Sequence, residues 1–164
     1  MRKHILAVMA AILVLALATI AMAEDPMVGT WKLNVEKSKF SQAYLAFTKQ
    51  AAPKEETRVF RIVNDHYEFS GTITRTDGSS RSFKCLIPKQ GGALECEGPA
   101  REGFSLIFTV IGPGNWYATV LQNGKQTSAG PFAVSKDGKT LRDIDRGIDP
   151  QGKPFEQIQV FDKQ

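Results

Sequence analysis

Histidine is scarce in this chain of 164 residues, which contains only His4 and His66. His4 lies in an N-terminal segment that we expect to be removed, so His66 alone would remain. A single histidine excludes a metal site with several histidine ligands. It would also be the only histidine able to act as the base of a nucleophilic triad. His66 follows Asn64 and Asp65, a run typical of a turn before a strand.

Common catalytic and metal-binding motifs are also missing. The sequence has no G-x-S-x-G elbow and no glycine-rich phosphate loop. Asp143, Asp145 and Asp149 lie close together, but their order does not match an EF-hand calcium loop. On a strand, Asp143 and Asp145 would share one face, with Arg142 and Arg146 on the other. We therefore predict no catalytic residue, no metal and no cofactor, and favour a non-enzymatic protein.

A strong charge of one sign is absent. The chain has 21 basic and 17 acidic residues, and removing Arg2 and Lys3 would lower its net charge from +4 to +2. The basic residues are scattered along the sequence rather than grouped in stripes. This pattern does not favour a nucleic-acid partner.

Only one long apolar run occurs, from Ile5 to Ala23, and Thr19 is its only polar residue. Basic residues precede the run, and Ala21-Met22-Ala23 places small residues where a signal peptidase reads them. We predict a signal peptide over residues 1–23 and one exported domain over 24–164, periplasmic or extracellular and free of the membrane after cleavage. The alternative is a retained membrane anchor.

Cysteine is limited to Cys85 and Cys96. An even pair in an oxidising compartment favours a disulfide, and the alternative is two free buried thiols. The position of the expected turn supports the same pairing. If residues 89–92 close a hairpin, Cys85 lies directly opposite Cys96, and a bridge there would contribute about 2–3 kcal/mol.

The rest of the sequence consists of short alternating segments rich in Val, Ile, Thr and aromatic residues, separated by turn residues. This pattern predicts an all-β, antiparallel up-and-down meander that closes into a barrel of eight to ten strands. The expected strands are 28–34, 56–63, 66–76, 80–88, 92–98, 103–111, 115–122, 125–134, 139–147 and 153–162. Residues 41–52 read as a short helix capped by Ser41 and ended by Pro53, able to plug one barrel end, or as an irregular loop.

Two hairpin turns predict which residues face inward. A three-residue loop at 77–79 would place Ile73 opposite Phe83 and Phe69 opposite Ile87. The Gly112–Gly114 turn would place Val110 opposite Trp116 and Phe108 opposite Ala118, and so Phe104 opposite Gln122. No single pairing emerges for four C-terminal apolar residues, Leu141, Ile144, Ile158 and Val160.

Both ends of the expected domain carry a resemblance. Val28-Gly29-Thr30-Trp31 resembles the G-x-W opening of lipocalins, whose tryptophan packs across the closed base of the barrel. The run Gly29 to Asn34, with Lys37-Ser38-Lys39-Phe40 and the ending Phe161 to Gln164, is similar to a group of exported, lipocalin-like (calycin-type) bacterial proteins. The resemblance implies a structural role for Trp31, an arginine such as Arg142 or Arg146 over its ring, and a central cavity for a small apolar molecule. It carries no catalytic residues.

From these observations we expect an exported, non-enzymatic barrel that binds a small apolar or amphipathic ligand inside. Phe69, Phe104, Phe108 and Trp116 are the candidate lining, and the alternative for these four residues is plain core packing without a cavity. A second hypothesis is a periplasmic interaction or inhibitor module that contacts a protein partner through loops at one barrel end. A hydrolase using two carboxylates is the third.

Overall fold

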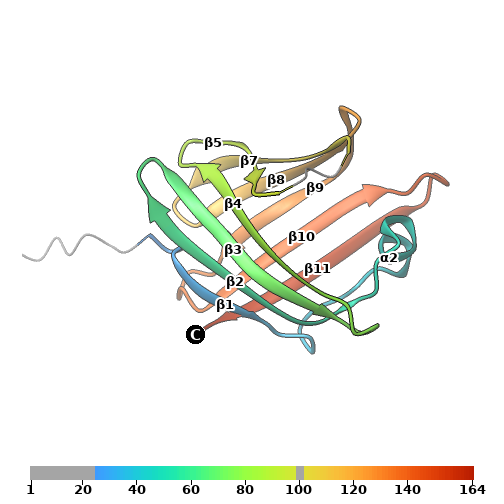
Figure 1. The fold of residues 1–164 in the computed structure, drawn as a ribbon, viewed down its shortest axis with the longest axis horizontal. Helices are drawn as coiled ribbons and strands as arrows, with labels where there is room; N and C mark the ends of the chain where they lie inside the picture. Colours follow the sequence, from blue (N-terminus) through green and yellow to red (C-terminus); the bar gives the residue numbers. More distant parts are fainter. Residues whose placement is uncertain (1–24, 99–101) are drawn as a thin grey trace, which may run out of the picture.

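The computed structural model describes residues 25–98 and 102–164, so the expected signal peptide lies outside the described residues. The described chain forms one antiparallel sheet in the order β5-β7-β8-β9-β10-β11-β1-β2-β3-β4-β6, together with one short helix (Figure 1). The elements are β1 (Gly29–Leu33), α2 (Gln42–Thr48), β2 (Pro53–Val63), β3 (His66–Arg75), β4 (Ser80–Pro88), β5 (Gly91–Ala93), β6 (Glu95–Cys96), β7 (Phe104–Gly112), β8 (Asn115–Gln122), β9 (Lys125–Val134), β10 (Thr140–Ile148) and β11 (Pro154–Lys163).

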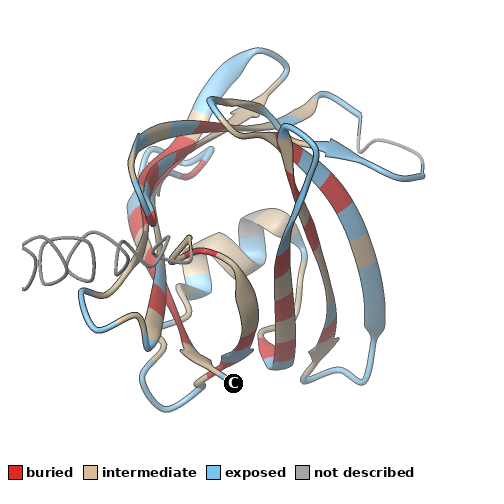
Figure 2. Cartoon of the chain, turned by 90° about the vertical axis from the view of Figure 1, so that its left-hand side faces the viewer, coloured by how far each residue is buried: buried red, intermediate tan, exposed pale blue. Residues whose placement is uncertain are grey.

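The sheet curls into a nearly closed barrel, which Figure 2 shows end-on. It has eleven strands rather than eight to ten, because the expected strand 92–98 divides into β5 and β6. β5 pairs with β7, whereas β6 pairs with β4. Gly91 permits the close pairing of β5 with β7, since it adopts a φ of +91° and a Cβ there would lie 2.6 Å from the Phe108 carbonyl oxygen; the change of partner follows at Leu94. Residues 91–96 therefore bridge the seam between the two ends of the sheet.

A disulfide joins Cys85 of β4 to Cys96 of β6, and the two cysteines are directly paired across the strands. The prediction from the sequence is confirmed at this position. Cys85 is buried, whereas Cys96 is exposed at the seam. The bridge therefore fastens the closing segment to β4.

The expected register of the preceding hairpin is wrong by two residues. Ile73 pairs with Arg81 instead of Phe83, and Phe69 pairs with Cys85 instead of Ile87. The loop lies one residue earlier than predicted, at residues 76–78, because the Arg75 amide donates to the Ser79 carbonyl and continues the pairing; Asp77 accepts hydrogen bonds from the Ser79 amide and hydroxyl within this turn. A shift of two residues leaves every side chain on its predicted face.

The hairpin of β7 and β8 has the predicted register. Val110 pairs with Trp116, Phe108 with Ala118, and Phe104 with Gln122. Phe108, Trp116 and Ala118 are buried, as expected for the inward face. The sequence therefore placed this aromatic stripe correctly.

Trp31 closes one end of the barrel. Its ring is fully buried, and Nε1 donates a 3.0 Å hydrogen bond to the Met27 carbonyl. The cation over the ring is Lys163, whose Nζ lies 5.2 Å from the ring centroid. The expectation that Arg142 or Arg146 would take this place is wrong, because both lie on the outward face of β10 and are exposed.

The two segments that carry the resemblance pack against each other. Asn34 and Lys37 both contact the Asp162 carboxylate, at 2.6 Å and 3.1 Å. Ser38 donates to the Asn34 carbonyl and accepts from the Val160 amide. These residues therefore extend the pairing of β1 with β11 and fix the segment after β1 against β11.

α2 lies at the opposite end of the barrel, beside β11 (Figure 1). Ser41 caps its N-terminus by accepting from the Tyr44 amide, as predicted, and Lys49 ends it in a left-handed conformation with a φ of 54°. The helix is thus shorter than the expected range 41–52. Over residues 25–98 and 102–164, no helix has the length and apolar character needed to cross a membrane.

Candidate ligand cavity

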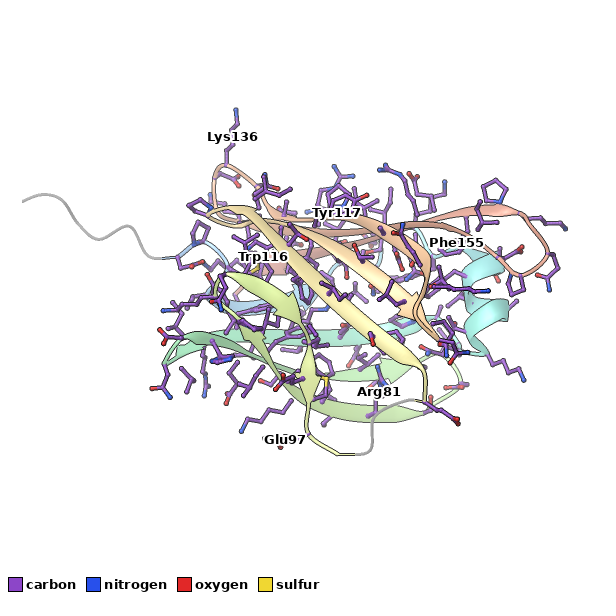
Figure 3. The ribbon with its side chains drawn as sticks, turned by 90° about the horizontal axis from the view of Figure 1, so that it is seen from above. Arg81, Glu97, Trp116, Tyr117, Lys136 and Phe155 are labelled. Atoms are coloured by element: carbon purple, nitrogen blue, oxygen red, sulfur yellow. A yellow bond between two sulfur atoms is a disulfide. The ribbon has the colours of Figure 1, made fainter. Side chains whose placement is uncertain are left out.

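A cavity of about 210 Å³ lies inside the barrel, in the half covered by α2. Tyr44 and Leu45 of α2 form part of its cover, and the Tyr44 ring packs against Phe155 of β11 at 5.3 Å between centroids. Figure 3 shows Phe155 beside the helix, and Arg81 nearer to that end than Trp116. The cavity therefore occupies the space between the helix and the packed aromatic core.

One wall of the cavity is apolar and is formed by inward side chains of β3, β7, β8 and β9. Its residues are Phe69, Ile73, Phe104, Leu106, Phe108, Ala118, Val120 and Phe132. Three of the four aromatic residues proposed from the sequence thus line the cavity. The fourth, Trp116, does not: it is 1% exposed and packs against Tyr67, Phe108 and Phe132 in the core.

The opposite wall is polar and comes from β2, β10 and β11. Its residues are Glu56, Arg58, Asp143, Asp145, Gln157 and Gln159. Their neighbours along the strands, Ile144, Ile158 and Val160, point outward. This arrangement explains why no C-terminal register emerged from the sequence: the inward positions are polar, so the usual rule that apolar residues face inward selects the wrong face.

Arg58 organises the deeper part of the polar wall. Its guanidinium donates to Glu56 at 2.6 Å, to Asp143 at 2.8 Å and to Gln159 at 3.2 Å. It also lies 4.1 Å from the centroid of the Phe161 ring. Burial opposes the charge, but the two carboxylates outweigh this effect and raise the pKa of Arg58. Each of its three nitrogens thus donates to a side chain of the wall.

Asp145 and Gln157 pair across β10 and β11, one step along the wall from this network. Burial raises the pKa of Asp145 to about 6, while a hydrogen bond from the Ser128 hydroxyl opposes the shift and the Asp143 charge adds to it. Gln157 is 7% exposed, and its Oε1 accepts no hydrogen bond from any described residue. Two acceptors therefore face the cavity at this level.

Two further arginines line the rim. Arg75 donates to Gln50 Oε1 at 2.7 Å, which fastens the end of β3 to the segment after α2. Arg81 is exposed on β4, close to the seam. The cavity is therefore acidic on its inner polar wall and basic at its mouth.

The polar wall was not predicted from the sequence, although one signal was present. Phe155, Gln157, Gln159 and Phe161 alternate along β11, so the buried aromatic residues at both ends fix the parity of the two glutamines between them. Asp143 and Asp145 do share a face, as predicted. Asp149 is separate from them, because its carboxylate accepts from the Gln151 and Lys153 amides in a turn. The described residues contain no group of three or more His, Cys, Asp or Glu side chains arranged to hold a metal ion.

No protein-family model matches the chain, and a search of curated proteins returned no significant match.

Proposed function

We propose that this protein is an exported, lipocalin-like (calycin-type) barrel that binds a small amphipathic molecule in its interior. The observation that carries the proposal is the cavity under α2, with one apolar and one polar wall. A ligand with an apolar body and a polar head would match both walls at once. Binding sites of this kind combine a mostly apolar lining with a few placed polar groups.

The packing of the polar wall supports the same conclusion. Buried polar groups cost free energy unless they find partners, and a barrel needs none of them for stability. Glu56, Arg58 and Gln159 satisfy one another, but Gln157 Oε1 is left without a donor among the described residues. A ligand that supplies a donor would remove this cost.

The resemblance of residues 29–40 and 161–164 to lipocalin-like exported proteins supports ligand binding inside the barrel. The apolar run and small residues before Glu24 support export, and the disulfide agrees with an oxidising compartment. The cavity volume favours a compact ligand, about the size of one aromatic ring with a short side chain.

Titration with 2-phenylethanol, followed by ¹H–¹⁵N NMR, tests the proposal. We expect saturable shifts at cavity residues such as Leu106 and Val120. Val120→Trp should abolish them by filling the cavity from its apolar wall. Thr109→Trp, which adds the same side chain on the exposed outer face of β7, should leave them unchanged.

The absence of saturable shifts in the wild-type protein, with 2-phenylethanol and with its amine and carboxylate analogues alike, would contradict the proposal. So would equal binding by the Val120→Trp and Thr109→Trp variants, since the ligand would then lie outside the cavity. Specific retention of a protein from an envelope lysate, together with a cavity that binds nothing, would favour the alternative interaction module instead.

A further inference from the structure

We infer that the cavity selects a ligand with a compact ammonium group on an apolar body, held by Asp145 and Gln157. This inference rests on the proposed function and specifies the ligand's head group. It follows from which acceptors of the polar wall are already used by the protein and which are not.

The donors of the Arg58 network are directed to side chains of the same wall. The Arg58 guanidinium is divided among Glu56, Asp143 and Gln159, and Gln159 Nε2 lies 3.3 Å from Glu56 Oε2. None of these donors is shared with the next level of the wall. That level presents two acceptors that no described cation pairs with, beside the N–H groups of the Gln157 amide itself.

The acceptors are Asp145 and Gln157, which are cross-strand partners and both line the cavity. Ser128 donates one hydrogen bond to Asp145, and no described Lys, Arg or His forms an ion pair with it. Gln157 Oε1 is more than nine-tenths buried and accepts from no described residue. An ammonium group has three N–H donors and no acceptor, so it can satisfy both side chains together.

The net charge of the inner polar wall supports the same inference. With every side chain ionised, the inner wall has three carboxylates, on Glu56, Asp143 and Asp145, against the single guanidinium of Arg58. The surplus is negative and lies in a partly desolvated interior, where charge interactions are stronger than in water. A cation is therefore favoured over a neutral head group, and an anion is disfavoured.

The arginines of the rim do not reverse this preference. Arg75 is bound to Gln50, and Arg81 is exposed to solvent, where water and salt screen its charge. Both extend from β3 and β4, across the barrel from β10 and β11. We expect their effect on a head group seated against Asp145 to be small.

Three ligands of similar shape test the inference: 2-phenylethylamine, 2-phenylethanol and phenylacetate, titrated by NMR at about pH 8, where Asp145 is ionised. We expect the amine to bind at least ~10-fold more tightly than the alcohol, because its hydrogen bonds are charge-assisted. Phenylacetate should bind most weakly.

Two variants locate the head group. Asp145→Asn should weaken amine binding ~10-fold and change alcohol binding less than about 2-fold. Gln157→Met should also weaken amine binding, while leaving stability equal or higher, because it removes a buried acceptor without a partner. The exposed Glu95→Gln is the matched loss of one carboxylate and should change neither affinity.

The outcomes separate the two proposals. Equal affinities for amine and alcohol, or tighter binding of phenylacetate, would overturn the inference and leave ligand binding intact. Full amine affinity in Asp145→Asn would do the same. If none of the three ligands binds, both the inference and the proposed function fall.

Discussion

The Asn34 side-chain amide donates a 2.6 Å hydrogen bond to Asp162 Oδ2, which ties the residue after β1 to β11. Lys37 approaches the other carboxylate oxygen at 3.1 Å. These contacts lower the pKa of Asp162, and the bond from Asn34 is the larger cause. One carboxylate therefore holds together the two segments on which the family resemblance rests.

We predict that Asp162→Ala lowers the free energy of unfolding by about 1 kcal/mol near neutral pH. Because the pKa of Asp162 is depressed by folding, its contribution is present above the unfolded-state pKa and is lost as pH falls through the folded-state value. Urea unfolding across acidic pH would measure it. The loss should be absent in Glu36→Ala, an exposed acidic residue of the same segment. If the free energy of unfolding fell equally with decreasing pH in the wild-type and Asp162→Ala proteins, the prediction would be contradicted.

Asp145 should give the opposite pH dependence. Its pKa is raised to about 6 by burial, so the folded state binds a proton more tightly than the unfolded state does. Its effect on stability is therefore most favourable below about pH 4 and declines by about 2 kcal/mol as pH rises to about 6. Asp145→Asn should match the wild type at the acidic end and exceed it at about pH 8. Parallel stability curves for the two proteins would exclude this account.

Truncation of Arg58 should be far more damaging than truncation of a surface arginine. Arg58→Met would leave Glu56 and Asp143 buried without their cation, and we expect a loss of about 3–5 kcal/mol. Arg146→Met breaks the exposed pair with Glu156, at 2.7 Å, and should cost less than about 1 kcal/mol. Denaturant unfolding of the two variants gives the comparison directly. Similar costs would show that the Arg58 network does not behave as a buried one.

The disulfide can be tested chemically. Alkylation of the unfolded protein without reductant should modify neither Cys85 nor Cys96, and alkylation after reduction should modify both. The double variant Cys85→Ala, Cys96→Ala should lose about 2–3 kcal/mol of stability, the amount expected for opening a loop of this length. Two alkylated cysteines without reductant would contradict the structure at this point.

The sequence was most informative where local rules and burial agree. The β7–β8 register follows from a short turn between two stripes of inward apolar residues, and the pairing of Cys85 with Cys96 follows from one loop. The register near Asp77 was wrong because the loop starts one residue earlier than the Asp77-Gly78 dipeptide suggested, at Thr76. The division of the expected strand 92–98 arises because its first part pairs with β7 and its last part with β4, and turn residues do not reveal this.

The site was the least predictable part. Phe69, Phe104 and Phe108 were identified because aromatic residues on an inward face are visible in the alternation of a strand. Asp145 and Gln157 were not identified, because polar residues on the inward face of a strand give the same alternation as polar residues on a solvent-exposed face. Only the register of β10 with β11, which are joined by the turn at residues 149–153, reveals them as neighbours.

The seam between β4 and β7 has a consequence for how this protein meets other chains. Residues 91–96 pair with only short stretches of the two strands, from Ile107 to Thr109 on one side and at Cys85 and Leu86 on the other. Hydrogen bonds from the Leu94 amide to the Leu106 carbonyl and from the Glu97 amide to the Lys84 carbonyl extend this pairing. Among the described residues, no ladder continues beyond them along the seam side of β4 or β7, and such edges recruit further strands. Reduction of the disulfide would free β6 and lengthen these edges. Solubility, as well as stability, would then depend on folding in a compartment where the bond can form.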